Sequence, residues 1–300
     1  DFDGDGDVDY LAGNLGLNTL FKASAEQPVS VYAADFDGNQ GYDAIPSVFF
    51  TNRQGKPEEF PYHNRMDMDK QLIASKRAYL LHAEFAQTNM QQYLNNFKEV
   101  KPLHLTATHM QSSFIKNLGN GKFSVEPLPI EAQFAPIYAM AAGDWNGDGH
   151  LDALCVGNDY GSEVTTGRYD AFNGLLLLGN GKGQFASASL LEAGFYLPGD
   201  AKSMVQLSNA RGEQCFVVGQ NRGPLQVFKP NLAAPRLFSY GEKDAFAVVK
   251  MANGKTKRYE LYQGHTFLSQ STRKLWLPAN AVEVGITDFQ GKTRVEKLRK

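Results

Sequence analysis

The chain has 300 residues, of which 29 are glycine and 12% are aromatic, and this composition suits an all-β protein with many turns. A formal net charge of −2 excludes a generally basic nucleic-acid-binding protein. The sequence contains no run of about 18 apolar residues, so it predicts no transmembrane segment.

The sequence begins with an acidic stretch that contains glycine, DFDGDGDVD at 1–9, and similar stretches recur as DFDGNQGYD at 35–43 and DWNGDGHLD at 144–152. We call these the first, second and third loops and number their positions from one to nine. The candidate metal-ligating positions are one, three, five, seven and nine. They hold Asp1, Asp3, Asp5, Asp7 and Asp9 in the first loop, Asp35, Asp37, Asn39, Gly41 and Asp43 in the second, and Asp144, Asn146, Asp148, His150 and Asp152 in the third.

Alternate side-chain oxygens on a loop tight enough to need glycine converge on one point, where they repel one another unless a cation is present. Calcium takes six to eight oxygen ligands at about 2.3–2.6 Å. Position seven varies in type, as expected if it contributes only its backbone carbonyl. We therefore predict up to three Ca²⁺ sites; the alternative is that the loops are solvated Asp-Gly turns without an ion.

The residues around the loops distinguish these sites from EF-hands. An EF-hand needs a glutamate at position twelve of its loop, where this chain has Ala12, Pro46 and Cys155. Short apolar runs, typical of strands rather than helices, flank the loops. Each loop is therefore predicted to be a calcium-binding turn between two β-strands.

The loop pattern, together with the turns GNGKF at 119–123 and GNGKGQF at 179–185, resembles the FG-GAP or VCBS repeat. The resemblance covers roughly residues 1–230. It implies an all-β protein with the calcium-bearing blades of an integrin-type β-propeller, here about four blades in a partial ring over residues 1–235. The segment YQGHTFLSQSTRKLWL at 262–277 resembles the ASPIC/UnbV domain, which implies a small β domain at 236–300.

The second and third loops are much farther apart in sequence than the first and second, which predicts an insertion. Apolar residues at helical spacing place an α-helical insertion at about 64–100, with helices at 67–82 and 88–99. Thr88 and Gln91 form a candidate capping box for the second helix. The helices are expected to pack through Leu72, Leu80, Leu94 and Phe97, either as a recognition appendage or as a cover over one face of a sheet.

The connection at 159–174 is long, polar and aromatic, and it holds candidate ligand-binding residues. These are Tyr160, Glu163, Arg168, Tyr169 and Asp170. The alternative is that Arg168 and Asp170 only fix this connection to its own sheet.

Structural rather than chemical roles are expected for two cysteines and two histidines. Cys155 and Cys215 are interpreted as buried thiols rather than a disulfide. His104 and His109 are five residues apart, on opposite faces of a strand, and are therefore not expected to bind a metal together.

The sequence shows no nucleophile elbow, no phosphate-binding glycine loop and no acid–base pair outside the three loops, so we do not predict an enzyme. The resemblance implies a bacterial protein that is extracellular, on the cell surface or periplasmic, and that binds a protein or a glycan. A carbohydrate-binding lectin and a non-catalytic part of a secreted or surface enzyme are the alternatives. Because Asp1 already occupies a ligand position, we expect a fragment of a longer protein, in which the second and third loops bind calcium more reliably than the first.

Overall fold

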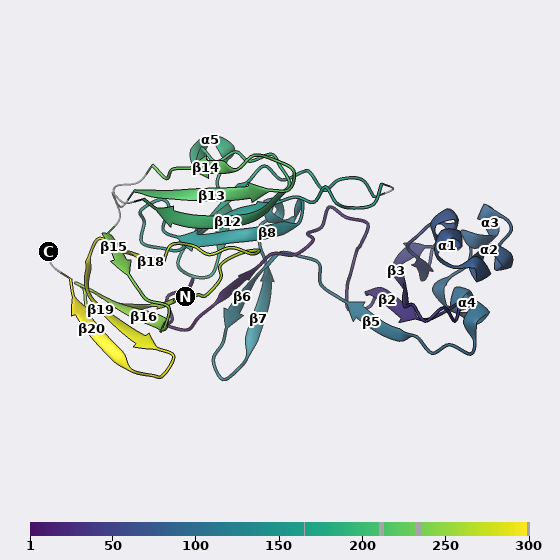
Figure 1. Ribbon diagram of the computed structural model, residues 1–300, viewed down its shortest axis with the longest axis horizontal. Helices are drawn as coiled ribbons and strands as arrows, with labels where there is room; N and C mark the ends of the chain where they lie inside the picture. Colours follow the sequence, from purple (N-terminus) through teal and green to yellow (C-terminus); the bar gives the residue numbers. More distant parts are fainter. Residues whose placement is uncertain (165, 210–212, 232–235, 299–300) are drawn as a thin grey trace. The chain divides into compact units, whose positions relative to one another are not determined.

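A computed structural model describes residues 1–164, 166–209, 213–231 and 236–298 (Figure 1). As predicted, the protein is all-β, with 39% strand and 11% helix. The strands form several separate sheets, and none of the described sheets closes on itself. The chain divides into two compact units: unit 1 holds residues 1–18 together with those from 111 onward, and unit 2 is Thr19–Met110. No helix of the described residues combines the length and apolar character needed to cross a membrane.

The third loop connects two strands of a four-stranded antiparallel sheet in unit 1, the third-loop sheet. Its strands lie side by side in chain order: β8 (Ile137–Gly143), β9 (Asp152–Gly157), β10 (Leu175–Gly179) and β11 (Phe185–Ser187). All six residues of β9 are buried. The predicted strand–loop–strand arrangement is therefore confirmed for the third loop.

The first loop leads into a three-stranded antiparallel sheet, the first-loop sheet, of β1 (Tyr10–Ala12), β6 (Ser113–Asn117) and β7 (Phe123–Pro127). Ala12 of β1 pairs directly with Ser113 of β6, although all of unit 2 lies between them in sequence. Short helices between Arg65 and Phe97 coincide with the helical insertion predicted at about 64–100, but the segment inserted between β1 and β6 is larger. The inserted segment is unit 2, and it includes the second loop.

The two turns that share the letters GNGK occupy different registers in their hairpins. Phe123 pairs with Asn117 in the first-loop sheet, whereas Phe185 pairs with Gly179 in the third-loop sheet. Residues 117–123 of the first hairpin therefore correspond in structure to residues 179–185 of the second. In this alignment the two GNGK sequences are shifted by two residues relative to one another.

Three further strands of unit 1 form another antiparallel sheet, which we name the fourth sheet: β12 (Ala201–Ser208), β13 (Gln214–Gln220) and β14 (Gln226–Phe228). The short helix α5 (Leu190–Ala193) precedes it. The sequence NARGE at 209–213 predicts a turn between two strands, and its residues 210–212 lie outside the described residues. Leu154 and Val156 of β9 share a buried core with Met204, Phe216 and Val218, so the third-loop sheet packs against the fourth sheet.

The C-terminal residues form a two-stranded and a four-stranded sheet. The first pairs β15 (Arg236–Ser239) with β18 (Lys274–Leu277), and the second has the order β17 (Thr256–Glu260), β16 (Asp244–Met251), β19 (Ala281–Asp288) and β20 (Thr293–Lys297). The dipeptide Asn253–Gly254, which is typical of a hairpin turn, lies between β16 and β17, and Gly254 has the positive φ of 82° that favours glycine.

The C-terminal strands surround a buried cluster of their own, which includes Val249, Val284 and Ile286. The predicted domain boundary near 235 adjoins residues 232–235, which lie outside the described residues, and the domain limits 1–235 and 236–300 stay predictions. The segment after β17 also runs beside β12, where the hydroxyl groups of Thr266 and Ser271 accept hydrogen bonds from the backbone N–H groups of Met204 and Gln206.

Unit 2 contains a four-stranded antiparallel sheet and a set of short helices. The sheet order is β4 (Pro57–Pro61), β3 (Asp43–Thr51), β2 (Val29–Ala34) and β5 (Leu103–Ala107), and the second loop joins β2 to β3. The helical elements are α1 (Arg65–Gln71), α2 (Ile73–Ala78), α3 (His82–Phe85), α4 (Met90–Leu94) and η1 (Asn95–Phe97).

The two long helices predicted at 67–82 and 88–99 are therefore wrong in their bounds. Leu72 and Tyr79 have extended backbones, which divide the first predicted helix. The capping box begins one residue later than predicted, at Asn89 with Gln92, because the Thr88 hydroxyl donates backward to the carbonyl of Glu84. Thr88 thus satisfies the end of the preceding helix instead of starting the next.

The helices of unit 2 cover its sheet rather than project from it. Phe36 and Ile45, from the second loop and β3, lie in one buried cluster with Met68, Leu72 and Tyr93 of the helical segment. Two of the four predicted contact residues, Leu72 and Phe97, are buried and Leu94 is half-buried. Leu80 is 76% exposed, so its predicted packing role was wrong.

A matched pair of leucine substitutions tests this packing. Leu72 is fully buried, so Leu72→Ala should destabilise unit 2 by about 2–5 kcal/mol through lost burial and a cavity. Leu80→Ala should change stability by less than about 0.5 kcal/mol because Leu80 is exposed. Chemical denaturation followed by circular dichroism at the helical band measures both, and equal effects of the two variants would contradict the described core.

An ion pair in the four-stranded C-terminal sheet should make the free energy of unfolding depend on pH. Asp244 is buried and accepts hydrogen bonds from both terminal nitrogens of Arg294, at 2.5 and 2.6 Å, which lower its pKa below the ordinary 3.8. A lowered pKa means that the stabilisation is fully present above the ordinary pKa and is lost as pH falls through the folded-state value.

Asp244→Asn should therefore cost about 2–3 kcal/mol at pH 7, and the difference from the wild type should shrink on acidification below about pH 4. Tryptophan fluorescence during urea denaturation is a suitable measure, because both tryptophans lie in unit 1. Glu242→Gln is the control, since Glu242 is 78% exposed in its side chain and its ion pair with Arg273 should contribute little. A difference that widens in acid would contradict the assignment.

Candidate metal centre

The three loops share one set of hydrogen bonds between side chains and backbone. The side chain at position three accepts from the N–H of position five, the side chain at position five accepts from position seven, and the carboxylate at position one accepts from position six. The position-three bonds measure 3.2 Å at Asp3, 3.2 Å at Asp37 and 2.9 Å at Asn146; the position-five bonds measure 2.9 Å at Asp5, 2.6 Å at Asn39 and 2.8 Å at Asp148; the position-one bonds measure 3.4 Å at Asp1, 2.9 Å at Asp35 and 2.9 Å at Asp144.

Positions four and six adopt left-handed backbone conformations in all three loops. Position four is always glycine. Position six is glycine in the first and third loops, with φ of 96° and 90°, but it is Gln40 in the second loop, with φ of 70°. A residue with a Cβ atom pays about 1–2 kcal/mol in this region, so the second loop carries strain that the other two avoid.

A buried aspartate at position nine ties the first and third loops to their sheets. Asp152 accepts a hydrogen bond from the N–H of Trp145 at 2.8 Å and another from Gly179 at the end of β10, at 3.0 Å. Asp9 makes the equivalent contacts with Phe2 and Asn117, both at 2.9 Å. These four donors are backbone N–H groups, so the geometry depends on the fold rather than on the donor side chains.

The position-nine residue of the second loop, Asp43, is held differently. Its Oδ1 accepts a hydrogen bond from Gln71 Nε2 of α1 at 3.4 Å, and its Oδ2 is buried without a hydrogen-bond partner. The helical segment thus reaches the second loop directly.

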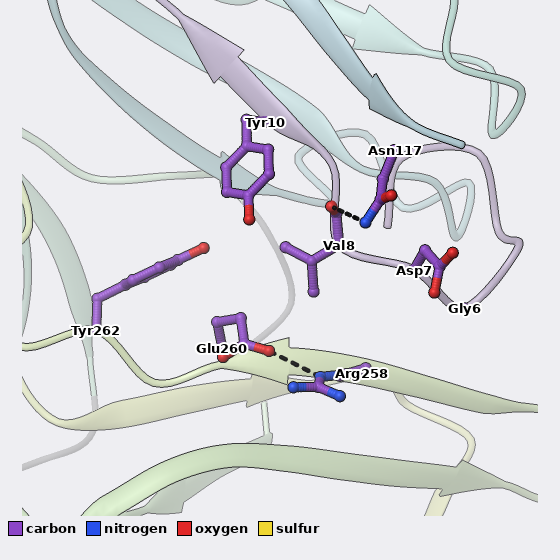
Figure 2. Close-up of a pocket in the computed structure, with 8 residues that line it drawn as sticks. All are labelled: Gly6, Asp7, Val8, Tyr10, Asn117, Arg258, Glu260 and Tyr262. Carbon is purple, nitrogen blue, oxygen red and sulfur yellow. Dashed lines mark hydrogen bonds and ion pairs between the residues drawn. The ribbon is translucent and has the colours of Figure 1, made fainter. Parts of the chain in front are cut away.

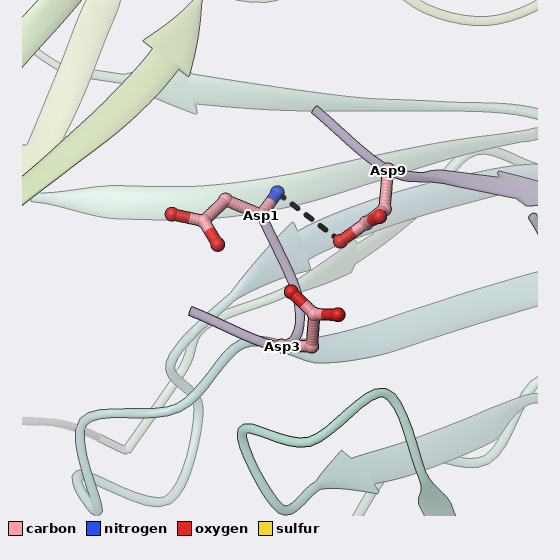
Figure 3. A group of neighbouring side chains, drawn as sticks. All are labelled: Asp1, Asp3 and Asp9. Carbon is pink, nitrogen blue, oxygen red and sulfur yellow. Dashed lines mark ion pairs between the residues drawn. The ribbon is translucent and has the colours of Figure 1, made fainter. Parts of the chain in front are cut away.

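In the first loop, Asp1, Asp3 and Asp9 bring one carboxylate oxygen each to within 4.8 Å of the others (Figure 3). Lys116 of β6 also lies here, with its Nζ 2.7 Å from Asp3 Oδ2. Burial raises the pKa of Asp3, but the hydrogen bond from Lys116 and the backbone N–H of Asp5 outweigh it and lower the pKa overall. Lys116 therefore places a positive charge against the carboxylates of this loop.

Like charges crowd the third loop. Burial raises the pKa of Asp152, and the charges of Asp148 and Asp144 raise it further, against the backbone bonds that favour the charged form. Lys257 of β17 is close to this loop: burial lowers its pKa, and the charge of Asp144 opposes that effect. A cation in the third loop would relieve the repulsion among its carboxylates.

The donor set fits a hard divalent cation. Carboxylate and amide oxygens occupy positions one, three, five and nine, and an ionised carboxylate keeps lone pairs after accepting one N–H bond. Oxygen donors of this kind suit calcium or magnesium rather than a soft metal. Among the described residues, the group formed by Asp1, Asp3 and Asp9 is the one trio of histidine, cysteine and acidic side chains with metal-binding proximity.

Two of the five candidate ligand-binding residues in the connection from β9 to β10 line a cavity. Tyr160 and Arg168 border a space of about 470 Å³ with Asp200 and Arg222, and the Arg168 guanidinium lies 4.9 Å from the centre of the Tyr160 ring. The other three candidates, Glu163, Tyr169 and Asp170, are absent from its lining. Tyr169 instead forms a backbone bridge with Asp159 at the base of the connection.

The charged group that anchors this connection was missed in the sequence. Asp159 accepts a hydrogen bond from the Tyr138 hydroxyl at 2.7 Å and faces Lys202 Nζ at 3.4 Å. Lys202 also lies 2.9 Å from Asp200 Oδ1. These residues come from three separate stretches of sequence, and no local motif connects them.

The cysteine and histidine predictions hold only in part: Cys215 is half-buried rather than buried, and His109 lies beyond the end of β5 at Ala107. Cys155 is buried, Cys215 is half-buried, and both are free. His104 stacks on Tyr32, with ring centres 4.2 Å apart and an angle of 7° between the rings.

A comparison of the sequence with models of protein families gives no match, and a comparison with curated proteins gives none either.

The strain at Gln40 predicts a stabilising substitution. Gln40→Gly should raise the stability of unit 2 by about 0.5–1 kcal/mol, because the relief of left-handed strain exceeds the entropy that glycine adds to the unfolded chain. Thermal denaturation followed by circular dichroism measures the change.

The reverse substitution in the first loop is the matched control. Gly6→Ala should destabilise unit 1 by about 1 kcal/mol through backbone strain alone, since no atom lies within 4 Å of the added Cβ. If Gln40→Gly lowers the melting temperature, the left-handed conformation at position six is wrong.

Proposed function

We propose that the chain is a calcium-binding module of the β-propeller type that binds a protein or a glycan outside the cytoplasm. The observation that carries this proposal is the shared hydrogen-bond pattern of the three loops, with left-handed positions four and six. Solvated acidic turns have no need to repeat the same three bonds at the same positions. A common ligand geometry for a cation accounts for the repetition.

The arrangement of strands supports the propeller part of the proposal. A propeller blade is a four-stranded antiparallel sheet whose strands follow one another in order, as in the third-loop sheet. The first-loop sheet and the fourth sheet have three strands each in the same sequential order. The FG-GAP or VCBS resemblance adds the placement of calcium in the turn before the second strand.

Calcium is favoured over magnesium by the number of protein oxygens. Each loop offers four side chains with oxygen and a position-seven carbonyl, whereas magnesium keeps more of its waters. Dissociation constants of about 10⁻⁴–10⁻³ M are typical of extracellular calcium modules, and such sites are filled where calcium is millimolar. This supports an extracellular, cell-surface or periplasmic location for a bacterial protein with these loops.

Calcium removal tests the proposal. With Kd of about 10⁻⁴ M and about 1 mM calcium, one site stabilises the folded state by roughly 1.4 kcal/mol. For a unit of this size, that corresponds to about 3–6 °C in melting temperature. Asp148→Ala should remove the contribution of the third loop, so its melting temperature should differ from the wild type more in calcium than in chelator.

Asp170→Ala is the matched control, because it removes the same charge from an exposed position outside the loops. It should keep the full calcium response of the wild type. If chelator leaves the wild-type transition unchanged and calorimetry detects no calcium binding, the loops are not calcium sites and the proposal fails.

A further inference from the structure

A cavity of about 410 Å³ lies in unit 1 between the first loop and the C-terminal strand β17 (Figure 2). On one side it is lined by Asp7 and Tyr10, which belong to the first loop and β1. On the other side it is lined by Arg258, Glu260 and Tyr262. The two walls are far apart in sequence, and both belong to unit 1.

The alternation of an extended chain explains why three polar residues share the second wall. Side chains two residues apart in a strand point to the same face. Arg258, Glu260 and Tyr262 therefore face the cavity, whereas Leu261, between them, is buried in the C-terminal core. Tyr262 follows the end of β17 but continues the same alternation.

The second wall is held in place by its own contacts. Arg258 Nε donates a hydrogen bond to Glu260 Oε1 at 2.7 Å, and the guanidinium lies 4.1 Å from the centre of the Phe246 ring. Figure 2 shows the hydroxyl groups of Tyr10 and Tyr262 directed toward the space beside Glu260. The two tyrosines are about half exposed, at 47% and 53%, so their rings and hydroxyls are open to a ligand.

We propose that this cavity binds a neutral saccharide residue, which deepens the proposed function by naming the ligand class and rests on it. The carboxylates of Asp7 and Glu260 accept hydrogen bonds from sugar hydroxyls, and the tyrosine rings offer apolar faces to sugar C–H groups. Two carboxylates against one guanidinium give a negative surround that disfavours an acidic sugar. The volume is within the usual range of about 300–1,000 Å³ for small-ligand sites.

The cavity shares a residue with the first loop. Asp7 occupies position seven, and its N–H donates to Asp5 Oδ1 at 2.9 Å as part of the shared loop pattern. A cation that orders the loop therefore also orders one wall of the cavity. Saccharide affinity should be higher in calcium than in chelator.

The test uses the full chain and the methyl glycosides of glucose, galactose, mannose and N-acetylglucosamine, with glucuronate as the acidic probe. Saturation-transfer NMR and titration in about 1 mM calcium measure binding. At least one neutral glycoside should bind, and glucuronate should bind more weakly. Tyr262→Ala and Glu260→Gln should each weaken binding about tenfold or more, which corresponds to about 1.4 kcal/mol. Tyr196→Ala is the control, because Tyr196 is 59% exposed outside the cavity lining.

Four outcomes would overturn the proposal: no neutral glycoside binds, glucuronate binds best, both cavity variants bind normally, or Arg168→Ala abolishes binding and so places the sugar at the other cavity. Circular dichroism confirms that each variant is folded. Calorimetric calcium titration of the same samples separates the two proposals. Calcium binding without saccharide binding overturns this inference alone, whereas the absence of calcium binding overturns the proposed function.

Discussion

The buried carboxylate at position nine of the first and third loops is the contact on which the rest of the arrangement depends. Each accepts one backbone N–H from position two of its loop and one from the last residue of a neighbouring strand, β6 in the first-loop sheet and β10 in the third-loop sheet. These bonds offset the cost of burying a charge. They also place the aromatic ring at position two in a core. Phe2 meets the rings of Phe114 and Phe185, and Trp145 meets those of Phe216 and Trp276.

The loops and their flanking strands were predictable because their determinants are local. A side chain that bonds a backbone N–H two residues ahead needs only the right residue at that spacing, and a left-handed position needs only glycine. The helical segment was less predictable. The apolar spacing predicted the helical segment, but the backbone breaks at Leu72 and Tyr79 fall on apolar residues that do not mark a break. The Thr88 hydroxyl bonds the preceding turn, whereas the sequence alone also allowed it to cap the following one.

Features that depend on pairing between distant residues were not predictable. The sequence of β1 does not specify that its partner, β6, follows some hundred residues later. The sequence therefore predicted an insertion within the region of unit 2, and not that unit 2 as a whole is inserted into the first-loop sheet. The register of the two GNGK turns was not predictable for the same reason, since it is set by strand pairing rather than by the turn. The group around Lys202 and the wall formed by Arg258, Glu260 and Tyr262 arise from packing between sheets.

The pairing of β1 with β6 has a consequence for the order of folding. Closing a flexible loop of unit 2's length costs about 3 kcal/mol more entropy than closing a short hairpin. That cost falls if unit 2 folds first, because its compact form brings the two ends of the chain segment to a limited range of separations. A chain emerging from the ribosome would then complete unit 2 before the first-loop sheet forms, so β1 would pair with β6 only after unit 2 has folded.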